Sequence, residues 1–272
     1  MMRFMMIVAD PEIARYALAS GVDRIFVDLE RLGKLERQGH RDTWISRHDA
    51  ADIARLRAVI PERALLVRLN PWHGGSLAEI ENAIAAGADQ LMLPMFRTLE
   101  ELAGFCRAVR DRVPVIPLVE TPEAMALLPE IARMPGIGEV YIGLNDLHLA
   151  LGLHFMFEPL ANGMLDRAAE ILHAAGMPFG FGGIARCGEG LLPAEKVLGE
   201  HVRLGSSSVI LSRTFHRQAS SLEALKGEMD FPGEVVKLRR ALAAYGAMGG
   251  EARERNRQEV ARLIRDIARA AR

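Results

Sequence analysis

The chain has 272 residues, of which half are hydrophobic and a quarter are charged, and its formal net charge is −1. This composition is typical of a globular protein with a large core, and it excludes disorder, collagen-like repeats and a coiled coil as the main architecture. The balanced charge provides no general attraction to nucleic acid or to an anionic membrane, so we expect neither as a partner.

The cysteines and the N-terminal segment indicate a cytoplasmic protein. Cys106 and Cys187 are too few for a disulfide framework, and their spacing matches no zinc motif. The short apolar run at the N-terminus meets Asp10-Pro11 too early for a signal peptide. No apolar run approaches the roughly 20 residues that a membrane helix needs. We therefore expect a soluble cytoplasmic protein.

Short apolar runs alternate with amphipathic stretches along most of the chain. The runs are almost continuously apolar, which is typical of strands that are buried on both faces. They predict eight strands, at Phe4–Ala9, Arg24–Glu30, Ala64–Asn70, Gln90–Phe96, Val113–Glu120, Glu139–Asp146, Pro178–Ala185 and Ser207–Ser212. Eight strands separated by helices favour a closed (β/α)8 TIM barrel, with an open doubly wound sheet as the alternative. The GxGxxG fingerprint that would favour the open sheet is absent after the first strand.

Capping signals mark the helices between these strands. Asp10 precedes a proline at a predicted helix start, and Ser76 and Thr98 each precede a glutamate by three residues, the spacing of a capping box. One further helix is predicted over Thr121–Arg133, with a proline in its first turn.

The end of the chain differs from the repeat. Residues 1–230 are predicted to form the barrel and residues 231–272 a helical extension, with helices over Glu234–Tyr245 and Ala252–Ala271. The last helix has one apolar face, which indicates packing against the barrel or against another subunit. A nucleic-acid arm is disfavoured because four acids interleave with its arginines and no aromatic residue is present.

Polar side chains follow the apolar interiors of several predicted strands. The catalytic groups of a barrel enzyme lie at the C-terminal ends of its strands, so we expect these side chains to meet at one mouth. In chain order they are Asp28, Glu30, Arg68, Asn70, Pro94, Glu120, Asn145, Asp146, Gly182, Gly183 and Arg186.

Two of these residues suggest a metal site. Glu120 and Asp146 end neighbouring predicted strands, and a pair of carboxylates suits Mg²⁺ or Mn²⁺, which take their remaining ligands from water or substrate. Without a cation the two groups would repel each other and one would be protonated. The alternative is that each pairs with a separate arginine, and we favour the metal.

Arg68 ends an otherwise apolar strand. Its planar guanidinium can hold a carboxylate by two parallel hydrogen bonds, so we expect it to anchor an acidic substrate. The alternative is a salt bridge to Asp28 or Glu30, and both roles can hold together if the acids orient the arginine. Contacts to substrate are also expected from Glu30, Pro94 and Asn145.

The remaining residue types limit the chemistry. None of the four lysines ends a predicted strand, which disfavours a Schiff-base aldolase. Motifs for a P-loop, a zincin and a nucleophile elbow are absent. His40, in the long polar connection after the second strand, is as plausible a catalytic group as a structural one. We expect His148 to have a structural role or to support residues of the site, and we expect surface positions for His48, His173 and His201.

Several short motifs follow one another in a characteristic order. They are Val27-Asp28-Leu29-Glu30, Val67-Arg68-Leu69-Asn70-Pro71, Gly87-Ala88-Asp89 with Met92-Leu93-Pro94-Met95, Leu118-Val119-Glu120-Thr121-Pro122-Glu123-Ala124, and Gly143-Leu144-Asn145-Asp146-Leu147 with Leu151-Gly152. The ordered set resembles the HpcH/HpaI aldolase and citrate lyase β-subunit superfamily. That resemblance implies a pyruvate/phosphoenolpyruvate-type barrel, a divalent metal on Glu120 and Asp146, and contact between Arg68 and the carboxylate or enolate oxygen of a 2-oxo acid.

The sequence departs from the aldolase branch at two positions. Arg31 stands where that branch carries its base histidine, and Leu118 stands where it often has glutamine, which is closer to the lyase branch. We therefore take His40 as the substitute base, oriented by Asp42 or Asp28.

These observations predict a metal-dependent (class II) aldolase or carbon–carbon lyase that joins or releases a 2-oxo acid and an aldehyde through a pyruvate enolate. Two alternatives stay open: a lyase or thioesterase acting on an acyl-CoA thioester, and a barrel without catalytic activity that serves for binding. The resemblance also implies a homo-oligomer, a trimer or hexamer formed through the C-terminal helices.

Overall fold

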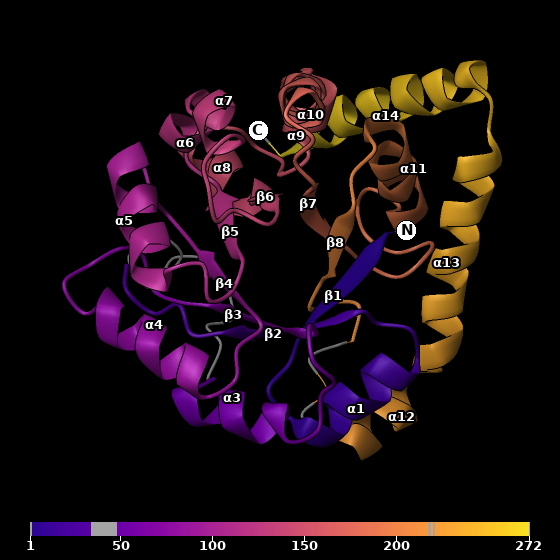
Figure 1. Ribbon diagram of the computed structural model, residues 1–272. Coiled ribbons are helices and arrows are strands. Elements are labelled where there is room, and N and C mark those ends of the chain that lie inside the picture. Colours follow the sequence, from indigo (N-terminus) through magenta and orange to yellow (C-terminus); the bar gives the residue numbers. More distant parts are fainter. Residues whose placement is uncertain (1, 34–47, 217–218, 220, 272) are drawn as a thin grey trace.

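The structure is a computed structural model that describes residues 2–33, 48–216, 219 and 221–271. Its parallel strands close into a barrel in sequence order, because β8 pairs with β1 as well as with β7. The (β/α)8 barrel with additional C-terminal helices is confirmed, and the open sheet is excluded (Figure 1). The strands are β1 (Arg3–Ile7), β2 (Arg24–Asp28), β3 (Leu65–Arg68), β4 (Gln90–Leu93), β5 (Val115–Val119), β6 (Val140–Ile142), β7 (Phe179–Ile184) and β8 (Ser208–Leu211).

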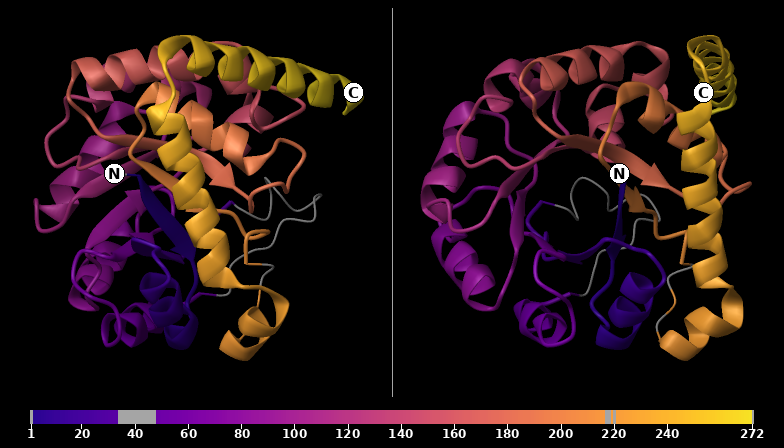
Figure 2. Two further views of the ribbon diagram at one scale, coloured as in Figure 1. Left: turned by 90° about the vertical axis from the view of Figure 1, so that its right-hand side faces the viewer. Right: turned by 45° about the vertical axis from the view of Figure 1, so that its right-hand side comes forward.

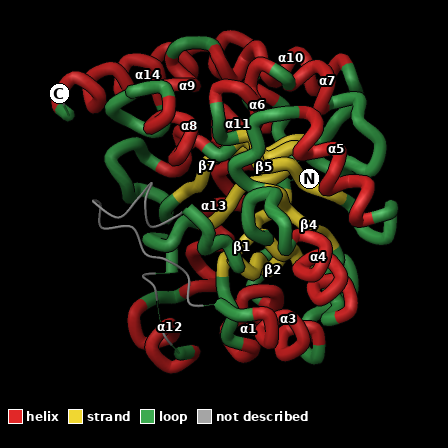
Figure 3. Tube along the Cα trace, turned by 90° about the vertical axis from the view of Figure 1, so that its left-hand side faces the viewer, coloured by secondary structure: helices red, strands yellow, loops and turns green. Residues whose placement is uncertain are grey.

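Helices surround this central barrel, as Figure 3 shows by secondary structure. They cover the apolar outer faces of the strands, which would otherwise be exposed to water. Their bounds are α1 (Pro11–Ala19), α3 (Ala50–Arg57), α4 (Ser76–Ala85), α5 (Leu99–Val109), α6 (Pro122–Ala126), α7 (Leu128–Ile131), α8 (Leu144–Ala150), α9 (Glu158–Ala161), α10 (Met164–Ala174), α11 (Ala194–Leu204), α12 (Leu222–Glu228), α13 (Phe231–Ala247) and α14 (Gly250–Ala270).

The predicted helix caps form in two of three cases. The Asp10 side chain accepts hydrogen bonds from the first amides of α1, and Thr98 begins α5 with a complete capping box. Ser76 does not cap α4, which begins after Gly75 instead. The glutamate of that spacing, Glu79, is held by Asn70, whose Nδ2 donates to it at 2.8 Å. The single helix predicted over 121–133 is divided into α6 and α7.

The inside of the barrel has its own small core. The side chains that fill it are Met5, Phe26, Leu66, Met92, Ile116, Leu118 and Tyr141. At the N-terminal ends of the strands, Glu139 closes this core below: its Oε2 lies 3.0 Å from both Arg24 and Arg3. The apolar side chains fill the inside of the barrel, and the ion pairs of Glu139 close its N-terminal end. The C-terminal mouth is therefore the open end of the barrel.

The C-terminal helices pack on the barrel. Figure 1 and both views of Figure 2 show α13 running along the side of the molecule and α14 crossing over its end near α9 and α11. Val260 and Ile264 of α14 are buried, and Asn256 donates to Glu200 of α11 at 3.1 Å. The predicted apolar face is thus covered within one chain. No helix in the described ranges is long and apolar enough to cross a bilayer.

Candidate active site

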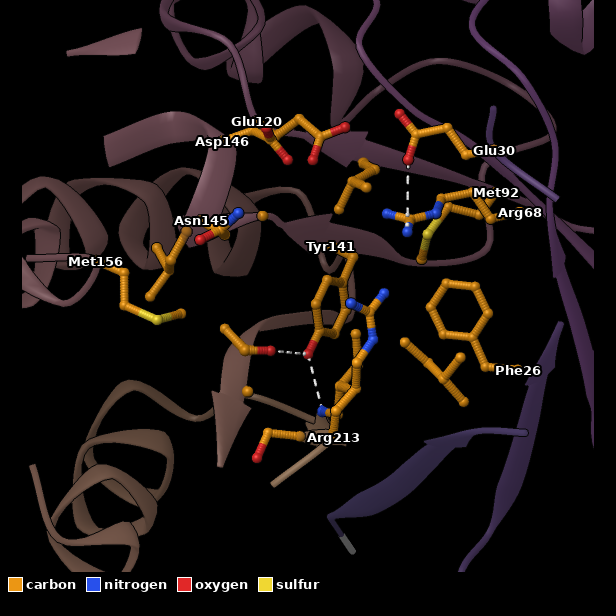
Figure 4. A pocket seen from close by; sticks show the side chains of 18 residues that line it. Phe26, Glu30, Arg68, Met92, Glu120, Tyr141, Asn145, Asp146, Met156 and Arg213 are labelled. Atoms are coloured by element: carbon orange, nitrogen blue, oxygen red, sulfur yellow. Dashed lines mark hydrogen bonds and ion pairs between the residues drawn. The ribbon is translucent and has the colours of Figure 1, made fainter. Parts of the chain in front are cut away.

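A cavity of about 300 Å³ lies at the C-terminal mouth of the barrel (Figure 4). It is lined by Ile7, Phe26, Glu30, Arg68, Met92, Leu118, Glu120, Tyr141, Gly143, Leu144, Asn145, Asp146, Met156, Gly182, Gly183, Ile210, Ser212 and Arg213. The period of two along a strand explains why charged groups stand above the apolar filling. Arg68 lies two residues after inward-facing Leu66, and Glu120 lies two after Leu118.

Arg68 is fixed by two acids. Its Nε and Nη2 each donate to one oxygen of Asp28 at 2.9 Å, and Nη2 lies 3.4 Å from Glu30. Burial lowers the pKa of Arg68, but the charges of Asp28 and Glu30 outweigh it, so that the pKa is raised. Its guanidinium carbon is also 5.5 Å from the centre of the Phe26 ring. The arginine is therefore a permanently charged donor in one orientation.

Glu120 is a buried carboxylate with negative neighbours. Burial, together with the charges of Glu30 and Asp146, raises the pKa of Glu120 well above its ordinary value. One of its oxygens accepts a hydrogen bond from the amide of Met95 at 3.1 Å. Met95 has φ +56°, a left-handed conformation that is uncommon outside glycine, so the backbone is strained where it holds this carboxylate.

Asp146 lies beside Glu120 but on a different element than expected (Figure 4). The prediction that it ends the sixth strand is wrong, because β6 stops at Ile142 and both Asn145 and Asp146 belong to the first turn of α8. The close approach depends on Gly143: a Cβ there would come within 2.8 Å of the Cβ and Oε2 of Glu120.

The carboxylate pair fits a divalent cation that keeps some ligands from water or substrate. Among the described residues no three His, Cys, Asp or Glu side chains come together as a metal-holding group, so an all-protein cage is not present there. The pKa of Glu120 is raised first by burial and then by repulsion from Glu30 and Asp146, and a cation beside the carboxylate pair would offset the repulsion. In the described part of the chain Glu120 forms no salt bridge to an arginine, so the alternative of separate arginine partners fails for it.

Comparison with known proteins shows the family of the chain. The family model described as HpcH/HpaI aldolase/citrate lyase matches residues 2–181. The chain belongs to this family. Its members are aldolases and lyases.

Among solved structures, an HpcH/HpaI aldolase from Desulfitobacterium hafniense shares the fold with a TM-score of 0.63 and 16% identity, over 86% of this chain and 95% of the other. A citrate lyase beta subunit from Mycobacterium tuberculosis, complexed with oxaloacetate and magnesium, has a TM-score of 0.59 and 18% identity, over 89% of this chain and 96% of the other.

A curated relative, the hydroxypyruvate/pyruvate aldolase of Sagittula stellata, is 30% identical over 132 residues. The match covers 38% of this chain and 51% of the relative, so this chain spans about half the length of the curated relative it matches.

Of the other predicted site residues, some line the cavity and some do not. Glu30 and exposed Asn145 line the cavity, whereas Pro94 is buried after β4 and is not among the lining residues of the described chain. His40 falls outside the described residues. Asn70 lines a different pocket, with His48 and Glu79, and its side-chain oxygen accepts a hydrogen bond from the amide of Arg31 at 2.8 Å.

His148 has the position expected of a structural residue, whereas His201 and His48 do not lie on the surface as predicted. His148 is buried, with its Nδ1 3.1 Å from the carbonyl oxygen of Leu144, as a structural role requires. His201 is not on the surface: it is fully buried and stacks on Phe181 with ring centres 3.7 Å apart. His48 is half-buried and accepts a hydrogen bond from the amide of Asp28 at 3.1 Å.

Arg213 and Tyr141 are among the cavity residues that the sequence did not predict. Arg213 follows β8, and its Nη2 lies 4.0 Å from Oδ2 of Asp28. Its position directly after the eighth predicted strand is the feature of the sequence that could have placed it at the mouth of the barrel. Tyr141 reaches across the barrel from β6: its hydroxyl donates to the carbonyl of Gly182 at 2.6 Å and accepts from the amide of Ile210 at 3.0 Å.

Proposed function

We propose that the protein is a divalent-metal-dependent (class II) aldolase or carbon–carbon lyase that acts on a 2-oxo acid through a pyruvate enolate. The observation that carries the proposal is the position of Arg68 across one cavity from the carboxylate pair of Glu120 and Asp146 (Figure 4). Membership of an aldolase and lyase family supports it, as do the pyruvate aldolase from Sagittula stellata and the magnesium complex of the mycobacterial relative.

Each group has a chemical task in this proposal. Glu120 and Asp146 would hold Mg²⁺ or Mn²⁺, which when bound supplies a Lewis acid for the oxygens of the 2-oxo acid. Arg68 donates hydrogen bonds to the carboxylate or to the oxygen on which negative charge develops. Since Asp28 and Glu30 hold Arg68 in place before the reaction, the donor needs no rearrangement as the charge forms.

The reaction conserves atoms and charge without another reagent. A base removes a proton from C3 of pyruvate, and the resulting enolate carbon bonds to the carbonyl carbon of the aldehyde, whose oxygen takes up a proton. Cleavage is the same sequence reversed. His40 is the proposed base. The apolar walls formed by Phe26, Leu118 and Tyr141 exclude bulk water from the reacting carbon.

A second candidate is a lyase or thioesterase acting on an acyl-CoA thioester. The observation that favours it is Leu118, an apolar lining residue at the position where the aldolase branch often carries glutamine. Metal-dependent binding of CoA thioesters without enolisation of pyruvate would support this candidate over the aldolase.

The substitutions Glu120→Gln and Asp146→Asn test the proposal directly. Each is expected to weaken Mn²⁺ binding, followed by electron paramagnetic resonance, and to abolish release of pyruvate from 4-hydroxy-2-oxo acids. Glu123→Gln is the control, because Glu123 is an exposed partner of Arg97 three residues from Glu120. Unchanged metal binding and pyruvate release in the two site variants would contradict the proposal.

A further inference from the structure

Asn70 joins the segment that follows β2 to the end of β3. It stands two residues after Arg68 and lines a second pocket, of about 240 Å³, instead of the cavity at the barrel mouth. Its side-chain oxygen accepts hydrogen bonds from two consecutive amides, of Arg31 at 2.8 Å and of Leu32 at 3.0 Å. Both amides come directly after Glu30, so Asn70 holds the chain where it leaves that residue.

The amide of Glu30 itself is held from the other side. It donates to Oδ1 of Asp28 at 3.2 Å, the same oxygen that accepts from Nε of Arg68 at 2.9 Å. Three consecutive amides are thus bonded either to Asp28, the partner of Arg68, or to Asn70. The carboxylate of Glu30 lines the cavity and lies 3.4 Å from Nη2 of Arg68, the ion pair drawn in Figure 4. The bonds to the backbone therefore hold Glu30 where its carboxylate meets the guanidinium.

Glu79, in the first turn of α4, orients the side chain of Asn70. One carboxylate oxygen accepts from Nδ2 of Asn70 at 2.8 Å, and the other accepts from its main-chain amide at 3.3 Å. Because an ionised carboxylate can only accept hydrogen bonds, the Asn70 nitrogen must face Glu79 and the oxygen must face the two amides. Nε2 of His73 lies 3.1 Å from the same oxygen of Glu79. The acid thus determines which way the amide group of Asn70 points.

We infer that Asn70 is a positioning residue that keeps the carboxylate of Glu30 against Arg68. Its own orientation comes from Glu79, and it acts through Glu30 rather than on the substrate. The inference rests on the proposed function, in which the cavity takes a 2-oxo acid. A carboxylate held against a guanidinium is largely neutralised, whereas one released into the same cavity repels an anionic substrate. Asn70 therefore keeps a negative charge from opposing the substrate.

Binding of oxalate with Mg²⁺ present tests the inference without any reaction. Oxalate is a planar dianion that resembles the enolate of pyruvate, and calorimetry gives its affinity. Asn70→Ala removes the acceptor of both amides and frees the carboxylate of Glu30, so it should weaken oxalate binding by about 10-fold. Affinity for Mn²⁺ alone, followed by electron paramagnetic resonance, should stay within about 3-fold, because Glu120 and Asp146 make no contact with Asn70. Equal losses for oxalate and Mn²⁺ would indicate general damage and overturn the inference.

An exchange of the two partners provides a rescue that a damaged fold would not show. Asn70→Asp alone sets a carboxylate against Glu79 and should weaken oxalate at least as much as Asn70→Ala. Combined with Glu79→Gln, it restores a donor and an acceptor with their roles reversed and leaves the net charge unchanged. The double variant should bind oxalate within about 3-fold of the original protein, because only the contact with half-buried His73 is lost.

The matched control for the exchange is Asn162→Asp. The side-chain oxygen of Asn162 also accepts a hydrogen bond from an amide, that of Met164 at 3.0 Å, but this residue is exposed at the end of α9. The control should bind oxalate like the original protein. A double variant at positions 70 and 79 that is no better than Asn70→Asp would overturn the role given to Glu79 and with it the inference.

A double-mutant cycle tests whether Asn70 acts through Glu30. In a Glu30→Gln background there is no carboxylate to release, so adding Asn70→Ala should change oxalate affinity by less than about 2-fold. A loss as large as in the original background would overturn the inference.

Failure of the inference and failure of the proposed function are distinguishable. Deuterium exchange of pyruvate by the original protein tests the function. Exchange together with an oxalate affinity that does not depend on Asn70 would refute the inference alone. An oxalate affinity that depends on Asn70 as expected, without exchange, would uphold the inference and refute the aldolase chemistry. An original protein that binds no oxalate with Mg²⁺ would overturn both.

Discussion

At the scale of single residues, the orientation of Arg68 matters as much as its charge. The guanidinium is held by two bonds of 2.9 Å to Asp28, so its remaining donors are aimed before substrate arrives. Arg68→Lys keeps a positive charge but loses the fork, and we expect pyruvate turnover to fall by about 10- to 100-fold. Steady-state assays give the measurement.

The matched control is Arg112→Lys. Arg112 also makes a two-pronged pair, with Glu81 at 2.7 and 2.8 Å, but on the surface. This variant should keep full activity. An Arg68→Lys enzyme as active as the Arg112→Lys enzyme would show that orientation is unimportant.

A second prediction at this scale concerns Glu120 and how the free energy of unfolding depends on pH. Burial and the charges of Glu30 and Asp146 raise its pKa above the ordinary 4.5 in the folded protein. The folded state therefore holds the proton longer than the unfolded state, and the free energy of unfolding falls as pH rises above 4.5. Removing the charge by Glu120→Gln should stabilise the metal-free protein by about 0.5–2 kcal/mol at pH 8.

The gain should vanish near pH 4, where both states carry the proton. Thermal unfolding with a chelator at the two pH values is the measurement. Added Mg²⁺ should stabilise the original protein at pH 8 and not the variant. A Glu120→Gln protein less stable than the original at pH 8 would show that the charge of the buried carboxylate does not destabilise the folded protein.

At the scale of elements, the site depends on how closely β6 and α8 approach β5. Gly143, between β6 and α8, has an ordinary φ of −85°, so alanine fits its backbone. A Cβ would nevertheless meet Glu120 at 2.8 Å. Gly143→Ala is therefore expected to displace the carboxylate and to lower metal affinity by about 10- to 100-fold, within the range for disturbed metal ligands.

Gly246→Ala controls for the change of residue type. Gly246 lies within α13 with nothing within 4 Å of an added Cβ. This substitution should leave metal affinity unchanged and raise stability slightly. Unaltered Mn²⁺ affinity in Gly143→Ala would mean that Glu120 does not need its present position.

The strands and the strand-end residues were predictable because buried parallel strands are continuously apolar and end where polar residues begin. Asp146 was assigned to the wrong element because Leu144 and Leu147 extend the apolar run of β6 into α8. His201 was misplaced because its stacking partner, Phe181, lies on β7, and no local pattern reports that contact. Arg213 was missed since it stands one residue beyond its predicted strand.

At the scale of the whole molecule, we expect the C-terminal helices and the barrel to unfold together. Ile264 of α14 is fully buried in the core that the barrel shares with its helices. Ile264→Ala should cost about 2–5 kcal/mol of unfolding free energy. Tryptophan fluorescence reports the effect on the barrel, since Trp44 and Trp72 both lie within residues 1–230. Exposed Arg265→Ala is the control, and an unchanged fluorescence midpoint in Ile264→Ala would mean that α14 unfolds separately.

The assembly of chains is a further prediction at this scale. We propose a trimer or hexamer, formed through the C-terminal helices, where Val236 of α13 is 43% exposed. Light scattering coupled to size-exclusion chromatography measures the mass. A monomer at micromolar concentration would contradict the proposal.

The most direct test of the central claim is deuterium exchange of the pyruvate methyl group in D₂O, followed by NMR. We predict exchange with Mg²⁺ or Mn²⁺, loss of exchange on chelation, and recovery when the metal is restored. We also predict no exchange in Glu120→Gln under any of these conditions. Absence of exchange with every divalent metal, or exchange that persists without metal, would contradict the claim that Arg68 and a metal on the carboxylate pair stabilise a pyruvate enolate.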